Sequence, residues 1–209
     1  MSVLNHLKWR YATKQFDATK TLLEDQITLL KDAFNLTATS YGLQTLSLVV
    51  VSNKELREQL KAHAYNQPQV TESSHLLVIC IQDDITDQDT DTHFENVKDI
   101  RKTPEDVVSP FRTRLKDMMK GMTKAERQQW SKHQAYITLG NLMTVCAVEG
   151  IDACPMEGFE PEAFDKLLNL EDHNLKSVLL LPVGFRSNQD PFASMKKVRK
   201  STKTTIIEM

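Results

Sequence analysis

The sequence has little cysteine and no apolar run long enough to span a membrane. Its three cysteines, Cys80, Cys146 and Cys154, are an odd number, and the first two lie within apolar segments. This usage argues against a disulfide framework and favours reduced, buried thiols. A secretory signal pattern is absent as well, because the charged Lys8 and Arg10 interrupt the first apolar stretch. The expectation is a cytoplasmic protein without a membrane partner.

An excess of charge of one sign is also lacking. The net charge is -2, so no overall basic field exists to attract nucleic acid, and a nucleic-acid partner has little support. The chain contains neither an internal repeat nor a low-complexity segment. With 209 residues and 40% hydrophobic content, it is long enough to fill one globular domain. We therefore expect a single domain over residues 1–209.

A long helix between two clear end signals is the centre of the expected fold. Thr123 and Glu126 form a capping-box pattern, and Gly150 closes the helical run. Apolar residues recur at helical spacing and continue on further faces in the second half: Ala135, Leu139, Leu142, Met143 and Cys146, with Ile137, Val145 and Val148. A helix that is apolar all round is buried. Gly140, in its middle, would allow a packing partner to approach closely.

Three nearly continuous apolar segments predict strands, at residues 46–51, 76–81 and 178–183. Strands that are apolar throughout belong to a sheet covered on both faces. Amphipathic patterns or capping signals predict the covering helices, which lie at residues 23–34, from Ser52 to Leu60 and from Pro161 to Leu168. The fold class is therefore α/β or α+β.

Two segments fall outside this layered plan. Residues 84–122 begin with an acidic run, usually a solvated loop, and then carry scattered apolar residues such as Phe94 and Phe111. We expect a helical excursion over the core there. The arm at about 190–209 carries a basic cluster followed by a β-prone end at 204–208. A strand so close to a terminus needs a sheet edge to pair with.

Polar groups that could bind a ligand occur in four places. Arg10 and Lys14 are four residues apart and can converge on one anion, although a solvated helix end is the commoner interpretation of such spacing. Residues 37–42 and 65–69 are rich in hydroxyls and amides, yet most such stretches are only loops. The turn from Pro155 to Gly158 presents backbone N–H groups that can serve a ligand.

Taken together, these pieces resemble the nitroreductase family, in particular the FMN-dependent, oxygen-insensitive NAD(P)H nitroreductases and their dihydropteridine-reductase relatives. The resemblance covers nearly the whole chain and rests on motifs in the family's order, at residues 10–17, Ser40 with Gln44, 66–69 with 72–75, 155–159, 182–184 and 197–199. It implies an α+β homodimer with a mostly antiparallel central sheet covered by helices. FMN would lie at the subunit interface, and a C-terminal strand would be added to the partner subunit's sheet.

The resemblance also implies which residues hold FMN. Arg10, Lys197 and Arg199 would clamp the phosphate, for which arginine supplies a bidentate fork. The two basic clusters of the chain would then form one site. The remaining implied cofactor-binding residues are Tyr11, Ala12, Lys14, Thr39, Ser40, Gly42, Asn66, Gln69, Pro155, Met156, Glu157 and Gly158.

These residues differ in the part of the flavin that they would contact. Lys14 would stabilise the negative charge of the reduced ring, and the amides of Asn66 and Gln69 would bond its pyrimidine edge. The turn at 156–158 would offer backbone N–H to flavin N5, and residues 39–42 would reach the cofactor from the partner subunit. No metal and no catalytic side chain is implied, because the chemistry would take place at FMN N5.

Several positions depart from the best-known members of the family. Ala12 stands where serine is common, which removes a phosphate hydrogen bond worth about 1 kcal/mol. Gly42 and the pair Thr45-Leu46 replace the more familiar asparagine and Pro-Trp, and Gln69 occupies a position held by lysine in some relatives. These departures bear on rate and substrate preference, whereas the cations expected to hold the phosphate remain.

The implied activity passes two electrons from NAD(P)H through FMN N5 to a nitroaromatic, quinone or related acceptor, by a ping-pong mechanism at one pocket. Solvent would supply protons, and Phe94 or Phe111 would cover the substrate. The sequence carries no Rossmann fingerprint and does not distinguish NADH from NADPH. Three alternatives stay open: a dihydropteridine or flavin reductase on the same fold, a non-catalytic flavin-binding protein, and a plain α/β domain with a solvated basic tail.

Overall fold

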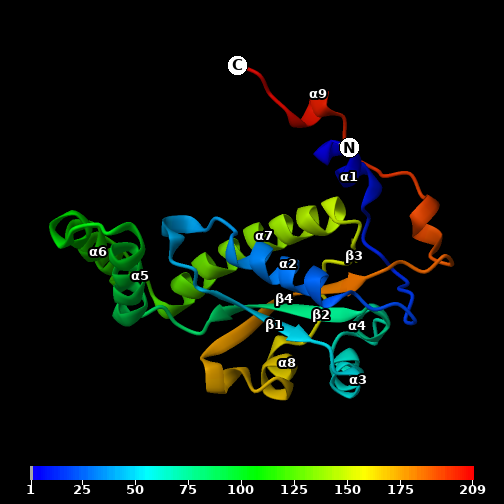
Figure 1. The fold of residues 1–209 in the computed structure, drawn as a ribbon, viewed down its shortest axis with the longest axis horizontal. Coiled ribbons are helices and arrows are strands. Elements are labelled where there is room, and N and C mark those ends of the chain that lie inside the picture. Colours follow the sequence, from blue (N-terminus) through cyan, green and yellow to red (C-terminus); the bar gives the residue numbers. More distant parts are fainter. Residues whose placement is uncertain (1) are drawn as a thin grey trace.

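The computed structural model describes residues 2–209, and its centre is a four-stranded antiparallel sheet (Figure 1). The spatial order is β1-β2-β4-β3, with bounds β1 (Leu46–Val51), β2 (His75–Gln82), β3 (Asp152–Ala153) and β4 (Leu175–Gly184). In the middle of the sheet, Val78 of β2 lies opposite Val49 of β1 and Leu180 of β4. The three predicted strands are confirmed, and their antiparallel pairing makes the fold α+β.

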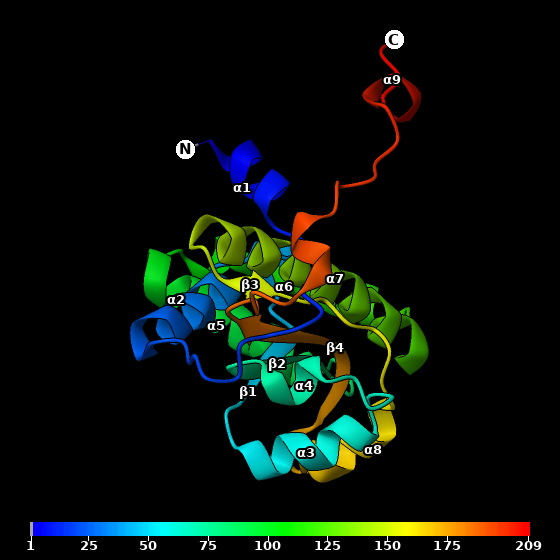
Figure 2. The same cartoon turned by 90° about the vertical axis from the view of Figure 1, so that its right-hand side faces the viewer.

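Helices cover both faces of this sheet (Figure 2). One face carries α2 (Glu24–Asn35) and α7 (Lys124–Val148); the other carries α3 (Lys54–Ala62), α4 (Gln69–Glu72) and α8 (Pro161–Leu167). Alternate residues of β2 join the two separate cores, Leu77, Ile79 and Ile81 on the α7 side and Leu76, Val78 and Cys80 on the α3 side. Because neither face meets water, the strand is apolar throughout instead of alternating.

The three cysteine thiols are free and buried, which agrees with the expected usage. Cys146 lies in the core between α7 and the sheet, whereas Cys80 and Cys154 lie in the core on the opposite face. Burial raises the pKa of Cys80 and of Cys146 to about 12. These thiols are therefore protonated at neutral pH and act as small apolar groups.

The long helix α7 has the ends expected from the sequence. The Thr123 hydroxyl accepts a hydrogen bond from the Glu126 N–H (3.3 Å), and the Glu126 carboxylate accepts one from the Thr123 N–H (2.7 Å). This pair completes the predicted capping box. After the helix, Gly150 has a φ of +67°, a conformation that glycine adopts without strain. Neither α7 nor any other helix within residues 2–209 is long and apolar enough to cross a membrane.

The expected burial of α7 on all sides is wrong for the single chain. The sheet and α2 cover its inner face, but apolar side chains of the outer face are exposed: Tyr136 by 46%, Ile137 by 51% and Val148 by 41%. A Cβ atom built at Gly140 would meet no atom within 4 Å, so no close packing partner stands there in this chain. The helix thus presents an apolar strip to its surroundings.

Residues 84–122 form the expected helical excursion as two helices, α5 (Asp87–Arg101) and α6 (Glu105–Lys120), which stand beyond one end of the sheet (Figure 1). Their own apolar cluster includes Phe94, Leu115 and Met119. The acidic run is helical from Asp87 onward, not a loop. Acidic side chains in a first helical turn face the positive end of the helix dipole, so the run suits a helix start.

The two chain ends lie on the same side of the molecule, α1 (Val3–Trp9) at one and the short helix α9 (Thr202–Thr205) at the other (Figure 1). The strand expected over 204–208 is not present in the single chain, because its first two residues belong to α9 and the rest is irregular. All side chains from Pro191 onward are exposed. Addition of this segment to a partner subunit's sheet stays a prediction.

Candidate functional site

The first basic segment is extended and lies along the sheet edge. Helix α1 ends at Trp9, and the chain then forms isolated bridges from Ala12 to Ala153 and from Phe16 to Arg186. Arg10 is the C-cap of α1, whereas Lys14 lies beyond the helix in the extended segment, so the two cations do not belong to one helix end. The bridges to Ala153 and Arg186 hold the segment in one direction along the sheet edge. They thereby position Arg10 and Lys14, which this segment carries.

Arg186 anchors this segment through stacking and an ion pair. Its guanidinium lies over the rings of Trp9 and Tyr11, 4.2 and 4.6 Å from their centroids. Its Nε donates to the carboxylate of Asp152 at 2.7 Å, and its backbone N–H donates to the other oxygen at 2.8 Å. Asp152 is only 5% exposed, so this interaction is shielded from water.

Asp190 anchors the same segment from the other side. Its carboxylate accepts hydrogen bonds from the Tyr11 hydroxyl (2.9 Å) and from the Lys14 backbone N–H (2.8 Å). Burial opposes ionisation of Asp190, but the donors around it outweigh burial and lower the pKa of the carboxyl group. Sequence reasoning missed Asp152, Arg186 and Asp190, because nothing in local spacing shows that they meet.

The cations of the two basic clusters converge. The Lys197 ammonium donates to the backbone carbonyl of Arg10. Lys197 is exposed overall, but loss of water around its ammonium group, then the charges of Arg10, Arg199 and Arg186, lower its pKa. Partial burial and the charge of Arg199 likewise lower the pKa of Arg10. A lysine and an arginine whose pKa is lowered by neighbouring positive charges mark a place where an anion is stabilised.

The amide-rich loop at 65–69 lies beside the turn at 155–158. Tyr65 and Asn66 adopt positive φ angles of 53° and 55°, and the Gln67 amide donates to the Gly158 carbonyl at 2.9 Å. Gln69 is only 5% exposed, and its Oε1 atom has no hydrogen-bond partner within residues 2–209. A buried acceptor of this kind costs free energy until a donor reaches it.

The turn at 155–158 offers fewer N–H groups than the sequence suggests. The Met156 N–H already donates to the Leu180 carbonyl at 2.9 Å, and Met156 accepts from Leu180 in return. This bridge holds the turn against β4. Within residues 2–209 the N–H groups of Glu157 and Gly158 donate to no acceptor. These two groups, and not that of Met156, can serve a ligand.

Residues 39–42 form a turn that the chain does not bring to the cations. The Ser40 N–H donates to the side chain of Gln134, in the first half of α7. Helix α1, which precedes Arg10, lies against the far end of α7, where the His6 ring is 3.1 Å from the Ala147 carbonyl. Gln134 and Ala147 are separated along α7 by about 20 Å, at 1.5 Å per residue. Within one chain, the predicted site residues thus fall into two groups.

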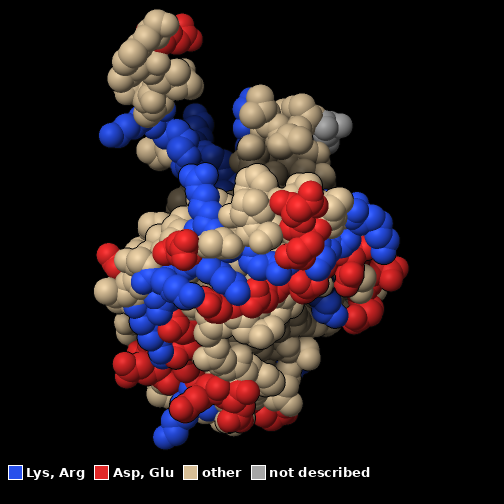
Figure 3. All heavy atoms as spheres, turned by 90° about the vertical axis from the view of Figure 1, so that its left-hand side faces the viewer, with Lys and Arg blue, Asp and Glu red and all other residues tan. Residues whose placement is uncertain are grey.

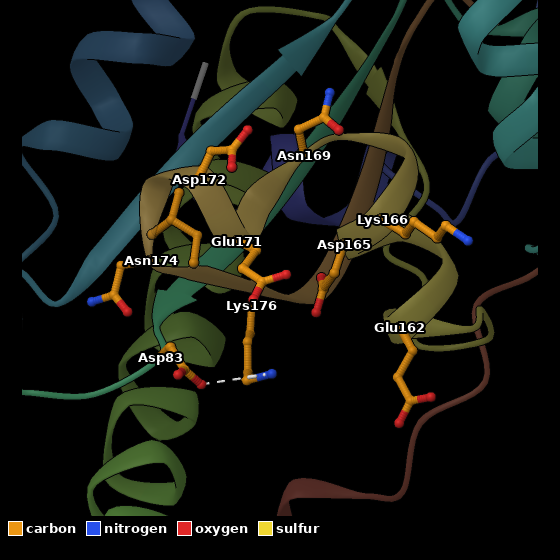
Figure 4. Close-up of a pocket in the computed structure, with 10 residues that line it drawn as sticks. Asp83, Glu162, Asp165, Lys166, Asn169, Glu171, Asp172, Asn174 and Lys176 are labelled. Atoms are coloured by element: carbon orange, nitrogen blue, oxygen red, sulfur yellow. Dashed lines mark ion pairs between the residues drawn. The ribbon is translucent and has the colours of Figure 1, made fainter.

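An acidic cavity of about 560 Å³ lies elsewhere, between α8 and β4 (Figure 4). Its polar lining contains Asp83, Glu162, Asp165, Glu171 and Asp172, with Lys166 and Lys176 as the cations. The excess of carboxylates repels an anionic ligand. Within residues 2–209 no group of three histidine, cysteine or acidic side chains could hold a metal ion. The cavity is therefore a poor candidate for an anion-binding site, in contrast to the cation cluster.

The layered α+β fold and the converging cations indicate a protein that can bind an anionic group at the edge of its sheet. The family model described as the nitroreductase family matches residues 7–185. The chain belongs to the nitroreductase family, and its general role is that of an oxidoreductase.

Sequence relatives carry matching names. The chain is 29% identical over 197 residues to a Staphylococcus epidermidis protein named "Putative NAD(P)H nitroreductase SERP2086", with 90% of this chain and 89% of that protein covered. It is also 29% identical over 196 residues to Bacillus subtilis YfkO, which has the same description, with 88% of each covered.

Solved structures share the fold. The Bacillus subtilis nitroreductase-type protein ydfN superposes with a TM-score of 0.88 at 19% identity, over 99% of this chain and 98% of that one. A protein of Exiguobacterium sibiricum, solved in complex with FMN, gives a TM-score of 0.87 at 18% identity, over 100% and 98% of the two chains. At these identities the likeness concerns the fold.

Proposed function

We propose that the protein is an FMN-dependent oxidoreductase that takes two electrons from NAD(P)H and passes them to nitroaromatics, quinones or related acceptors. The observation that carries this proposal is the convergence of Arg10, Lys197 and Arg199, three cations from opposite ends of the chain. Bound FMN supplies hydride and electron transfer, and the two substrates take turns at one site, which makes the kinetics ping-pong.

The residues present fit FMN in several independent respects. Arg10, Lys197 and Arg199 match a phosphate, which needs convergent positive charge. The orphaned Oε1 of Gln69 matches the donor N–H of a flavin pyrimidine ring, to which the exposed Asn66 amide also has access. The free N–H groups of Glu157 and Gly158 suit the acceptor at flavin N5. Tyr11, Ala12, Lys14 and Pro155 complete the proposed contacts on this chain.

We further propose a homodimer in which the second group of site residues comes from the partner subunit. Thr39, Ser40 and Gly42 lie by the first half of α7, far from the cations of their own chain. The hydroxyl of Thr39 is buried without a hydrogen-bond partner in residues 2–209. The exposed apolar strip of α7 and the open space at Gly140 suit close contact with a second copy.

The visible absorption spectrum of the purified protein tests the cofactor and the activity in sequence. We expect a yellow protein with flavin bands that bleach on anaerobic addition of NADPH or NADH, because a bound flavin is reduced by hydride transfer. Colour then returns on addition of a quinone or a nitroaromatic. Comparison of these acceptors with a pterin and free flavin measures the substrate preference.

Two results would contradict the proposal in different ways. A yellow protein that neither nicotinamide bleaches would be a flavin-binding protein without this activity. A colourless protein that cannot be reconstituted with FMN would show that the cation cluster is not an FMN site.

Replacement of Ile137 by glutamate tests the dimer. The side chain is 51% exposed on the α7 strip, and a two-fold interface would bury it twice. We expect dimer affinity to fall on the order of 100-fold, because each copy would bury a carboxylate without a partner. Sedimentation equilibrium measures the association, and the flavin-to-protein ratio should fall with it.

The matched control for this variant is Leu23→Glu, at an apolar side chain that is 71% exposed at the start of α2. It adds the same charge outside the strip and should leave the dimer unchanged. A protein that stays dimeric with full flavin content after Ile137→Glu would place the interface elsewhere.

A further inference from the structure

A second cavity, of about 520 Å³, lies between α5, α6 and the turn at 40–42. Its size is typical of sites for drug-sized ligands. Most of its lining is apolar or aromatic, with Tyr41, Phe94, Val97, Phe111, Leu115 and Met118 as the main contributors. Phe111 is 63% exposed and Tyr41 60% exposed, so two aromatic rings stand at an open apolar site that no other part of residues 2–209 covers.

The cations of α5 and α6 divide into two sets. Those that face away from the cavity are neutralised by acidic side chains of the same two helices, as in the pairs Lys98–Glu105 (2.6 Å), Lys116–Asp91 (2.6 Å) and Lys120–Asp87 (2.9 Å). Figure 3 shows this end of the molecule, where positive and negative side chains are interleaved. The cations Lys98, Lys116 and Lys120 are therefore already neutralised and have little free charge to attract an anionic ligand.

Arg101 and Arg114 differ from that set. Both line the cavity, and neither has a carboxylate within ion-pair distance in residues 2–209. The other polar side chains of this wall are Thr103 and His93, and the His93 ring packs edge-on against Phe94 with ring centroids 5.0 Å apart. Two unneutralised guanidinium groups beside an apolar surface are complementary to a ligand that is apolar over most of its length and anionic at one end.

The position of the cavity connects it to the proposed reaction. Tyr41 lies between Ser40 and Gly42, which the proposed function assigns to the cofactor of the partner subunit. The His93 ring lies 3.4 Å from the point where a Cβ of Gly42 would stand. A ligand in this cavity would thus border the cofactor, an inference that rests on the proposed function.

We infer that this cavity binds the electron acceptor and selects acceptors with an aromatic body and a carboxylate group. The body lies against the apolar wall that includes Phe94 and Phe111. Arg101 and Arg114 hold the carboxylate.

A matched pair of acceptors tests the selectivity: a nitronaphthoate and the nitronaphthamide with the same substitution pattern. The two differ in charge and hardly in shape. For the unmodified protein we expect the carboxylate to have the lower KM in steady-state turnover and the lower Kd in calorimetric titration. In Arg101→Gln with Arg114→Gln, both constants should rise about tenfold for the carboxylate and stay within about twofold for the amide.

Lys120→Gln is the matched control, because it removes a cation of α6 that is already paired with Asp87. It should leave both ligands unaffected. Equal affinity of the unmodified protein for carboxylate and amide would overturn the inference, and so would an equal loss of both ligands in the arginine variant. Calorimetry on the protein as purified needs no turnover, so these results are separate from a failure to reduce any acceptor, which would contradict the proposed function.

Discussion

Replacement of Arg57 by methionine is expected to lower the free energy of unfolding by about 4 kcal/mol, and the Tm by about 10 °C. Arg57 is only 2% exposed and has no acidic partner in residues 2–209. Its Nη1 donates to the carbonyls of Val70, Thr71 and Ser73, and its Nη2 to that of Ser52. Methionine fills much of the same volume but leaves several buried carbonyls without a donor, each at a cost of about 1–3 kcal/mol. Urea unfolding and calorimetry measure the loss.

Lys61→Met on the same helix is the control. Its ammonium makes one surface ion pair, 3.6 Å from the carboxylate of Glu58, and such a pair contributes about 1 kcal/mol at most. A stability loss after Arg57→Met no larger than that of the control would show that solvent replaces the guanidinium at these carbonyls.

The same substitution should weaken cofactor binding. Arg57 ties the end of β1 to residues 70–73, and these follow directly on the loop with Asn66 and Gln69. A flavin content that falls in step with stability would identify Arg57 as the residue that positions this loop. Retention of the full flavin content by a destabilised variant would limit Arg57 to a structural role.

The sheet could be predicted from the sequence because its signals are local. The segments at 46–51, 76–81 and 178–183 are apolar almost without interruption, a composition and length that favour strands of a sheet covered on both faces. The signal for the start of α7 is equally local, because one capping box spans only four residues. For α3 the local signal was ambiguous by one residue: Asn53, not Ser52, is the N-cap and accepts from the Leu56 N–H at 2.7 Å.

The arrangement around the cations could not be predicted in the same way. Arg186 follows β4 and contacts Asp152, Trp9 and Tyr11, which are far from it in sequence. The tertiary fold brings these residues together. No periodicity records such contacts. The extended path of residues 10–16 has the same origin, because bridges to the sheet edge override a spacing that suits a helix.

The outer face of α7 shows a further limit of sequence patterns. Ile137 and Val148 are apolar in the same way as the buried residues of the helix, and composition alone cannot distinguish the core of one chain from an interface between two chains. The structure shows through exposure that these two side chains lie outside the core of the single chain. The sequence pattern predicts burial of the whole helix, which is more than one domain easily offers, and the single chain leaves Ile137 and Val148 exposed.

The double substitution Lys197→Ala with Arg199→Ala is expected to have the largest effect on function. If both side chains bind the phosphate of FMN, each loses a charge-assisted hydrogen bond worth about 1.5–3 kcal/mol, and the Kd for FMN should rise about 1000-fold. Both side chains are exposed, so the stability of the flavin-free protein should hardly change. Desalting followed by absorption spectroscopy measures the retained flavin, and quenching of flavin fluorescence measures the Kd.

The double substitution Lys200→Ala with Lys203→Ala is the control. It distinguishes a defined phosphate-binding site from general attraction of FMN by the positive charge of the arm. It removes the same number of positive charges from the same exposed arm. Lys197 donates a hydrogen bond to the Arg10 carbonyl, whereas within residues 2–209 neither Lys200 nor Lys203 makes an ion pair or hydrogen bond with the segment that carries Arg10. A merely basic tail would attract FMN through total charge, and both double variants would then weaken binding equally, with a loss that vanishes at high salt. A defined clamp instead predicts a large loss in the first variant and almost none in the second. If neither variant loses flavin, the phosphate of FMN binds elsewhere, and the convergence with Arg10 has another purpose.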